Sequence, residues 1–487
     1  MENSSPTLKK QLSPMSVWAI AFGCIIGWGS FINPGKKFLF NSGAAGTAIA
    51  MVIGAIIMVI IAFNYAYMVP KYPKAGGQFT FAKICFGRVA AYFCGWFLVA
   101  AYLTNVPMNS TAIGLIVDGL FGPVLKFGFS YTIAGFEIYM GEMLFAMAIL
   151  VLFGVFNIKG VHVAGVIQTI LAFSLGASVL ILTIAAIVSG IATLDNTIPI
   201  WGFDKAAAVA ASHAGTYTTI ETFAHTGSVQ IFGAVLATLA IAPWAYVGFD
   251  TIPQAAEEYK FSPTKVSFIM IVAIAFGCFV YVANNTITAA ALTDWPERII
   301  NSEKTPWLLL AAAERLLGGY GKVIVGIAVF SAVLTGIMGF YMAASRLMYS
   351  MARDGYLPAP FAKVDPVHKT PKNALLFCIV ISLSGPILGR EALGWFVDMC
   401  AIGASIGFLF TCLATHVTMR KNGETSFWLS VASILGAAFS LFFIVLQLIP
   451  IPGLDFVHFC DESYCLLVVW IVIGVGFYIA KFGLTVR

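Results

Sequence analysis

Charged residues are scarce in this sequence. Asp, Glu, Lys and Arg together make up 10% of its 487 residues, whereas 60% of the residues are hydrophobic. A typical soluble domain carries about 25% charged residues, and the mean hydropathy here is +0.92. So few charges argue against a water-soluble protein. The composition predicts an all-α polytopic protein that crosses a lipid bilayer many times.

Sequence motifs of other functional classes are missing as well. There is no HExxH, no GxSxG and no paired-acid or Cys–His arrangement, so the chain is not predicted to be an enzyme. The lack of a P-loop argues against ATP-driven transport, and the lack of a repeated pore-lining polar stripe argues against a channel. No basic patch with interleaved aromatic residues points to nucleic acid. The nine cysteines show no CxxC or metal spacing, so we expect no cofactor.

The N-terminal residues do not have the pattern of a cleavable signal peptide. The first fifteen residues are polar and the first apolar run continues into a long segment, so no cleavable signal peptide is expected.

Cys460 and Cys465 fall in a polar loop between the last two apolar segments. They fit either a disulfide or two free thiols, and the sequence leaves both open.

Twelve apolar segments approach the roughly 20 residues that a transmembrane helix needs. They cover residues 14–40, 44–69, 89–119, 140–157, 164–190, 228–257, 265–292, 320–350, 374–389, 393–418, 427–449 and 463–482. Lys and Arg accumulate in cytoplasmic loops. With the N-terminus in the cytoplasm, 18 of the 27 Lys and Arg lie on the cytoplasmic side. This bias predicts a multi-pass cell-membrane protein with both termini inside.

The first and sixth segments carry residues that interrupt helices. The first reads GCIIGWGSFINPG over residues 23–35, and the sixth reads APWAYVGFDTIP over residues 242–253. Within a helix, Gly costs about 1 kcal/mol and Pro about 3 kcal/mol relative to Ala. Either interruption alone could be an ordinary kink. Two of them, five segments apart, indicate an inverted-repeat transporter with its site at the interface of the repeats.

Unwinding at these two places would free backbone groups that suit a zwitterion. N–H groups at the start of the outer half-helix attract an anion such as a carboxylate. Carbonyl groups at the ends of the preceding half-helices attract an ammonium group. The N–H donors expected to be free are those near Trp28, Gly29 and Ser30. The carbonyl acceptors expected to be free are those near Ile25, Trp244 and Val247.

Four sequence elements together resemble those of the amino acid–polyamine–organocation superfamily of permeases, in its bacterial form. Residues 23–35 are similar to the GxIGxGxFxxPG element, and residues 70–79 are similar to the PxxGGxY hairpin. Residues 244–258 resemble the aromatic stretch of the sixth helix, and residues 345–358 resemble the end of the eighth helix. The resemblance covers residues of about 14–420.

This resemblance implies the leucine-transporter-type fold, with two inverted repeats of five helices, two further helices and alternating access. It divides the chain into a cytoplasmic tail, a first repeat, an extracellular connection, a second repeat, and the last two helices with the C-terminal tail. The boundaries are 1–13, 14–190, 191–227, 228–419 and 420–487.

The resemblance also implies roles for individual residues. The substrate carboxylate would lie on backbone N–H groups of Gly27, Trp28 and Gly29, with Ser30 beside them. The amino group would lie on carbonyl groups of the first and sixth helices, and Trp244 would close over the substrate. Asp250 would be a gating or proton-linked carboxylate. The remaining members of the expected binding set are Ile25, Ala245, Val247 and Gly248.

Two departures from the family pattern affect what is transported and how. The residue between the two glycines is usually small, whereas Trp28 either narrows the pocket or offers an aromatic face to the ligand. Many relatives carry a fifth-helix Lys that resembles a built-in cation, but the stretch around Gln168 has none. Exchange without a driving ion and coupling to Na⁺ or H⁺ therefore all stay open, with Thr335 as a possible oxygen ligand for Na⁺.

Polar residues elsewhere in the segments have two interpretations. Asn105 and Asn109, one helical turn apart, either line the pocket or bond neighbouring helices. Gln168 and the Asn284–Asn285 pair are interpreted as structural.

The predicted function is secondary active transport of amino acids, by a permease or exchanger acting as a monomer or homodimer. Exchange of polyamines or other biogenic amines is the alternative, and a channel is a remote one.

Overall fold

The computed structural model describes residues 8–133, 136–301, 307–389, 392–450 and 458–483. The outer parts of the two predicted tails, residues 1–7 and 484–487, lie outside the described residues. So does the boundary between the ninth and tenth predicted segments at residues 390–391.

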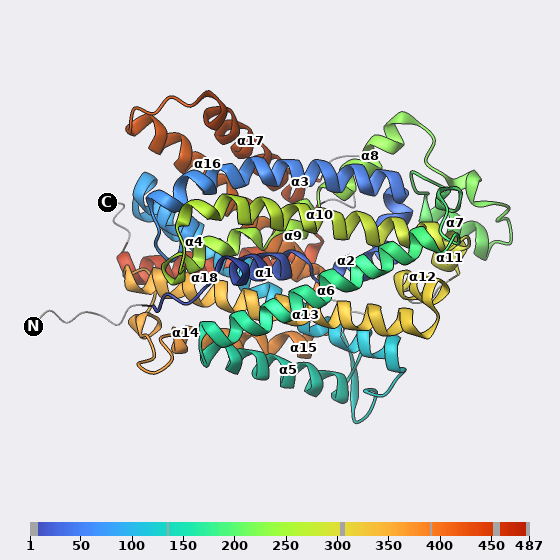
Figure 1. Cartoon of the computed structure of the whole chain (residues 1–487), viewed down its shortest axis with the longest axis horizontal. Coiled ribbons are helices and arrows are strands. Elements are labelled where there is room, and N and C mark those ends of the chain that lie inside the picture. Colours follow the sequence, from blue (N-terminus) through green and yellow to red (C-terminus); the bar gives the residue numbers. More distant parts are fainter. Residues whose placement is uncertain (1–7, 134–135, 302–306, 390–391, 451–457, 484–487) are drawn as a thin grey trace, which may run out of the picture.

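Long helices lie side by side along one axis of the molecule, and the two ends of the chain are at the same end of the bundle (Figure 1). The long helices are α3 (Leu39–Lys71), α4 (Gly77–Phe121), α5 (Met140–Ile158), α6 (Val161–Val188), α10 (Val266–Ala291), α13 (Gly319–Arg353), α16 (Ala392–Lys421), α17 (Phe427–Leu448) and α18 (Asp461–Phe482). The interrupted helices are α1 (Pro14–Ile25) with α2 (Gly29–Asn33) and the π-helical turn η1 (Pro34–Phe38), α8 (Ser228–Leu239) with α9 (Ala242–Tyr246) and the 3-10 helix η4 (Phe249–Glu258), and α14 (Lys372–Ser382) with α15 (Ser384–Leu388).

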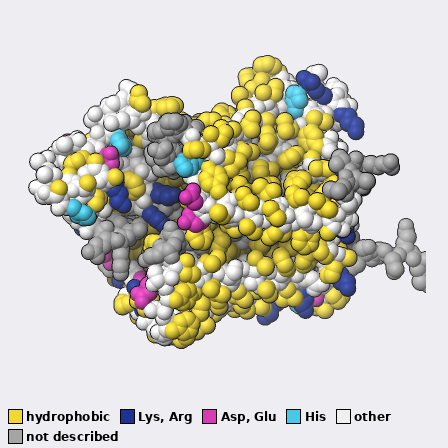
Figure 2. Space-filling model, turned by 180° about the vertical axis from the view of Figure 1, so that it is seen from behind, with side chains coloured by type: hydrophobic (Ala, Val, Ile, Leu, Met, Phe, Trp, Pro, Cys, Tyr) yellow, Lys and Arg dark blue, Asp and Glu magenta, His cyan; other side chains and the backbone are white. Residues whose placement is uncertain are grey.

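Among the described residues, ten helical runs are long and apolar enough to cross a membrane. The runs Pro14–Ile25 and Lys372–Leu388 are apolar but shorter. The prediction of an all-α polytopic membrane protein is therefore confirmed. Hydrophobic side chains cover most of the middle of the molecule, and charged side chains gather toward its ends (Figure 2). This distribution suits a bilayer around the middle.

Several short elements at the loops were not predicted. They are the antiparallel hairpin of β1 (Ser130–Ile133) and β2 (Phe136–Tyr139), the helices α7 (Lys205–His213), α11 (Trp295–Ile300) and α12 (Leu308–Leu317), and the 3-10 turns η2 (Leu194–Thr197), η3 (Ile220–Phe223), η5 (Pro263–Lys265) and η6 (Ala359–Ala362). Figure 1 places α7, α11 and α12 at the end opposite the termini. A search for windows of about 20 apolar residues does not detect such short elements. The expected extracellular connection, residues 191–227, thus contains structure of its own.

The helices differ in how deeply they are packed. The most apolar stretch of α13 is 72% buried inside the protein, whereas that of α18 is only 17% buried. The side chains of Val468 and Val472 on α18 are 58% and 64% exposed. In a membrane protein such an apolar outer face contacts lipid, so α13 is central and α18 is peripheral. All nine cysteines are free, so Cys460 and Cys465 are unpaired thiols in this structure.

A buried ion pair joins η4 to α13 at the end of the bundle where the termini lie. Arg346 donates from Nε and Nη2 to the two carboxylate oxygens of Glu258, over 3.1 Å and 3.2 Å, and neither side chain is more than 1% exposed. The N-terminal segment is attached at the same point. The N–H groups of Gln11 and Leu12 donate to the backbone carbonyl of Glu258, and Lys260 N–H donates to the Leu12 carbonyl.

We predict that Glu258→Gln strongly lowers the stability of the protein. Breaking a buried ion pair leaves an uncompensated charge and costs about 3–5 kcal/mol. The measurement is thermal unfolding of the purified protein in detergent. The matched control is Lys83→Gln, which removes an ion pair to Asp354 whose side chains are 40% and 25% exposed, and which is expected to cost no more than about 1 kcal/mol. Equal shifts for the two variants would contradict the prediction.

Candidate functional site at two broken helices

The first break lies between the end of α1 at Ile25 and the start of α2 at Gly29. The helical run that begins there continues to Lys71. The N–H groups of Gly27, Trp28 and Gly29 donate no hydrogen bond to any described residue. Three unpaired donors at the positive end of a helix suit an anionic group.

Ser30 sets the direction of these donors. Its backbone N–H and its Oγ both donate to the Gly27 carbonyl, over 3.3 Å and 3.0 Å. The C=O of Gly27 and the N–H of Trp28 belong to one planar trans peptide and point in opposite directions. Because Ser30 holds that carbonyl, the Trp28 N–H is directed away from the helix that follows.

The second break lies between α9 and η4. Val247 adopts an extended conformation with ψ of 131°, and Gly248 has φ of +141°, a region that only glycine enters readily. Val247 N–H donates to the Trp244 carbonyl over 3.3 Å. The carbonyl groups of Ala245, Tyr246 and Val247 accept no hydrogen bond from any described residue. These acceptors suit an ammonium group.

The two breaks touch each other. A Cβ atom at position 248 would lie 2.6 Å from the Ile25 nitrogen, so Gly248 packs its backbone directly on the end of α1. A Cβ atom at position 29 would lie 2.4 Å from Cη2 of Trp244, so the Trp244 ring packs on the start of α2. The sixth segment therefore contacts the first break on both sides, at Ile25 and at Gly29.

The two asparagines of α4 have different surroundings. Asn105 Nδ2 donates to the Ala101 carbonyl over 2.7 Å and lies 2.8 Å from Cys400 Sγ of α16, so this side chain bonds neighbouring helices. Asn109 lies at the first break. A Cβ atom at position 27 would be 3.7 Å from Asn109 Oδ1. That oxygen is buried and accepts no hydrogen bond from the described residues, so Asn109 is the better candidate for a pocket residue.

Asp250 is fully buried and is held by several donors. Gly248 N–H donates to Oδ1 over 2.9 Å, and Tyr102 OH donates to Oδ2 over 2.7 Å. Gln78 Nε2 donates to the same Oδ2 over 3.3 Å. The carboxylate therefore ties the second break to α4 rather than facing the N–H donors of the first break. Gln254 Nε2 completes the network by donating to Gln78 Oε1 over 2.6 Å.

Three further predicted or discussed residues surround the end of α1. Thr335 Oγ1 of α13 donates toward the Gly23 carbonyl over 3.0 Å and lies 2.8 Å from the Ser331 carbonyl on its own helix. Gln168 Nε2 of α6 donates to the Thr335 carbonyl over 3.0 Å. Trp28 is 4% exposed, and its Nε1 donates to no described residue. A role for Thr335 in binding Na⁺ and a role for Trp28 in the pocket both stay predictions.

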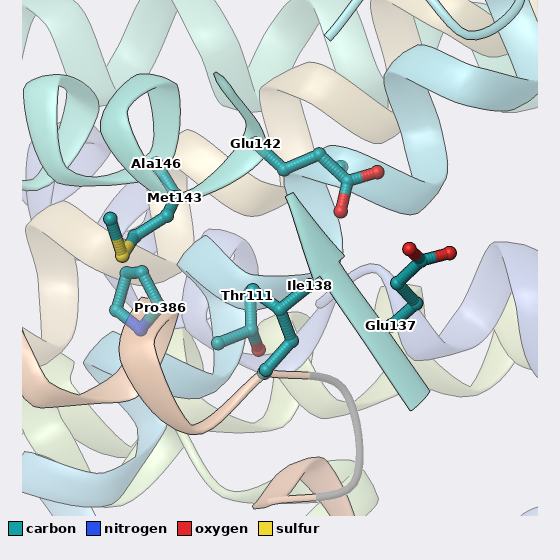
Figure 3. Close-up of a pocket in the computed structure, with 9 residues that line it drawn as sticks. Thr111, Glu137, Ile138, Glu142, Met143, Ala146 and Pro386 are labelled. Atoms are coloured by element: carbon teal, nitrogen blue, oxygen red, sulfur yellow. The ribbon is translucent and has the colours of Figure 1, made fainter. Parts of the chain in front are cut away.

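Sequence reasoning did not find Tyr102, although it lies on α4 only three residues before Asn105. It also did not find that Gly336 of α13 makes room for Asn109, where a Cβ atom would lie 2.9 Å from Asn109 Nδ2. A small pocket elsewhere is lined by residues that include Thr111, Glu137 and Glu142. The carboxyl groups of the two glutamates lie on the same side of this pocket (Figure 3). None of the residues of the two breaks lines that pocket.

We predict that Gly248→Ala destabilises the protein more than Gly87→Ala does. Both glycines have positive φ, and forcing Ala into such a conformation costs about 1–3 kcal/mol. A Cβ atom at position 87 would meet nothing within 4 Å, whereas at position 248 it would collide with Ile25 and Cys24. Such overpacking adds about 1–3 kcal/mol. Thermal unfolding of both variants measures the difference, and similar melting temperatures would refute the close contact.

A family model and several known transporters match the sequence of this chain. The family model described as "Amino acid permease" matches residues 12–477. The methylthioribose transporter of Bacillus subtilis is 25% identical over 97% of this chain and 93% of its own length. The branched-chain amino acid permease BcaP of Bacillus subtilis is 24% identical over 86% of this chain and 83% of its own. The human large neutral amino acids transporter small subunit 2 is 28% identical over 77% of this chain and 64% of its own.

The family model covers nearly the whole chain, including both breaks and the helices that surround them. Members of this family are multi-pass membrane transporters and not enzymes, as the sequence predicts. The protein therefore belongs to the amino acid permease family of the amino acid–polyamine–organocation superfamily.

Proposed function

We propose that this protein is a secondary active transporter that moves an amino acid across the cell membrane by alternating access. One observation carries the proposal. Two interrupted helices meet in the core, and each leaves backbone groups unpaired among the described residues, N–H donors at residues 27–29 and carbonyl acceptors at residues 245–247. A zwitterion carries one group of each kind, so an amino acid can satisfy both sets at once.

In this proposal the substrate carboxylate binds the N–H groups of Gly27, Trp28 and Gly29. The amino group binds backbone carbonyls at the ends of α1 and α9. The Ile25 carbonyl is shared with Tyr281 OH at 3.5 Å, so the unpaired carbonyls of Ala245 and Val247 are the better acceptors. The site is completed by Ser30, Asn105, Asn109, Trp244 and Gly248, with Asn109 closer to the break than Asn105.

The membrane arrangement belongs to the same proposal. The α1–α2–η1 segment and α3 cross separately, and α14–α15 crosses as one interrupted segment, which makes twelve crossings. Residues 14–190 and 228–419 form the two inverted repeats, and both termini lie in the cytoplasm. The position of both chain ends at one end of the bundle supports an even number of crossings (Figure 1). Arg88, whose guanidinium lies 5.1 Å from the Phe482 ring, belongs to the basic residues at that end.

Trp244 is proposed as the lid over the substrate because its ring rests on Gly29. Asp250 is proposed as a coupling residue because it links the second break to α4.

The transport cycle is either an exchange or is driven by H⁺ or Na⁺, with Thr335 as the oxygen ligand in the Na⁺ case. The name of one relative makes methylthioribose a ligand to be tested beside the amino acids.

We expect purified protein in liposomes to take up a labelled amino acid in a saturable way. Uptake should accelerate when unlabelled substrate is placed inside the vesicles, because a carrier reorients faster when loaded. The competitor panel contains neutral, cationic and acidic amino acids, polyamines and methylthioribose, and the uptake is repeated with H⁺ and Na⁺ gradients. Linear, non-saturating flux would point to a channel. Competition by polyamines or methylthioribose without any amino acid would overturn the proposed substrate class.

We predict that Asp250→Asn lowers transport about tenfold or more. An amide offers one acceptor oxygen, so its NH₂ group would face either the Gly248 N–H or the Gln78 Nε2, both of which now donate to the carboxylate. A buried hydrogen bond left unmade in this way costs about 1–3 kcal/mol. Tyr102→Phe should reduce transport in the same direction. The control is Asp398→Asn, which changes a carboxylate of α16 that accepts from Ser463 and is not at a break. Wild-type rates for Asp250→Asn between about pH 5 and 8 would remove the coupling role.

A further inference from the structure

Helix α10 lies along the first break and contacts both sides of it. Tyr281 OH lies 3.5 Å from the Ile25 carbonyl at the end of α1. One turn later, Asn284 Nδ2 donates to the Ser30 carbonyl in the first turn of α2, over 3.1 Å. A Cβ atom at position 277 would lie 2.6 Å from Cγ2 of Ile25, so Gly277 lets α10 approach the break closely. This helix therefore supports the two half-helices from one side.

Asn284 is fully buried, and its side chain has one polar contact with the described residues. Its Oδ1 accepts no hydrogen bond from any of them. A buried amide oxygen without a partner costs about 1–3 kcal/mol. The amide group therefore lowers the stability of the protein at this position. Its presence is explained if the hydrogen bond from Nδ2 to Ser30 serves substrate binding. Thr288 Oγ1 donates to the backbone carbonyl of Asn284, which leaves the side-chain amide unaffected.

The bond to Ser30 is the start of a chain of contacts that reaches the donors of the site. Asn284 holds the Ser30 carbonyl, and Ser30 holds the Gly27 carbonyl through its N–H and Oγ. The Gly27 carbonyl in turn sets the direction of the Trp28 N–H through the planar peptide. Without the first contact, the first turn of α2 is held less firmly, and the donors lose a fixed direction.

We propose that Asn284 is a positioning residue for substrate binding, which acts through Ser30 to orient the backbone N–H groups at residues 27–29. The inference rests on the proposed function, because those N–H groups are the proposed carboxylate site. Asn284 does not need to touch the substrate. Its effect is pre-organisation, which improves binding by lowering the cost of ordering the site.

The neighbouring residue is a matched control. Asn285 is also buried in α10, donates from Nδ2 to a backbone carbonyl, and leaves its Oδ1 without a partner among the described residues. Its acceptor is the Gly43 carbonyl at the kink of α3, 3.3 Å away and outside the break. The two asparagines therefore share burial, helix and bonding pattern, and they differ in which backbone segment they hold.

The experiment compares Asn284→Leu with Asn285→Leu in proteoliposomes. Leucine keeps the branched shape of asparagine and removes both the donor and the unpaired oxygen, so both variants are expected to fold with melting temperatures near that of the wild type. For Asn284→Leu we expect the KM for the transported amino acid to rise about tenfold while kcat changes by less than about threefold. For Asn285→Leu we expect a KM within about twofold of the wild type.

A second comparison tests the route through Ser30. Ser30→Ala should also raise KM, and the double variant with Asn284→Leu should raise it by less than the product of the two single effects, because both changes act on one chain of contacts. If Asn284→Leu fails to fold, Asn284→Ser replaces it, since its shorter hydroxyl side chain removes the contact with less change of polarity.

The outcomes separate this inference from the function itself. If wild-type protein transports no amino acid, the proposed function fails, and the positioning role fails with it. If the wild type transports and the two leucine variants have the same KM, Asn284 is only a packing residue. A multiplicative double variant would show that Asn284 acts on binding independently of the bond from the Ser30 hydroxyl to the Gly27 carbonyl, outside the proposed chain of contacts. Either of the last two results overturns the positioning role.

Discussion

Backbone N–H and C=O groups inside a bilayer have no water to bond with, and this constraint governs the core of the protein. Each group left unpaired in hydrocarbon costs several kcal/mol. The first break nevertheless leaves three N–H groups without partners among the described residues, and the second leaves three carbonyls. Such an arrangement is stable only where protein or a bound ligand covers it. The breaks are accordingly covered by other helices: both contact α13, and the second break is also bound to α4 through Asp250.

The residues around the breaks limit how much of the backbone is left unpaired. Ser30 occupies the Gly27 carbonyl, and Trp307 Nε1 donates to the Phe31 carbonyl over 3.1 Å. On the other side, Asp250 accepts the Gly248 N–H and is itself held by Tyr102. What stays free is a short row of donors at the first break and a short row of acceptors at the second. The same side chains that stabilise the interruptions thus restrict the free groups to those that the proposal assigns to the ligand.

Much of this could be predicted from the sequence, because hydropathy and backbone breakers are local properties. The apolar segments, the interruptions at Gly27–Gly29 and Val247–Gly248, and the family all follow from residues that are close together in the chain. The partners of Asp250 could not be predicted in the same way. Whether Tyr102 or Asn109 faces a break depends on the rotation of α4, and that rotation is set by packing against several helices. The short elements α11 and α12 were missed because they are too short to show as apolar segments.

The charges buried in the core bear on which ligand the breaks can hold. Among the described residues, the buried charged side chains are Glu142, Asp250, Glu258 and Arg346. Glu258 and Arg346 pair with each other, Asp250 already accepts from several donors, and Glu142 lines the separate pocket of Figure 3. Asp250 is thus a charged group at the second break, and its carboxylate is already solvated by Gly248 N–H, Tyr102 OH and Gln78 Nε2. The other free groups of the two breaks are backbone dipoles and amides. Dipoles can balance the two opposite charges of one zwitterion, but a polyamine brings several positive charges with no carboxylate to offset them. Burying an uncompensated charge is far more costly than burying a paired one, and this cost is the physical reason for proposing an amino acid rather than a polyamine as the ligand.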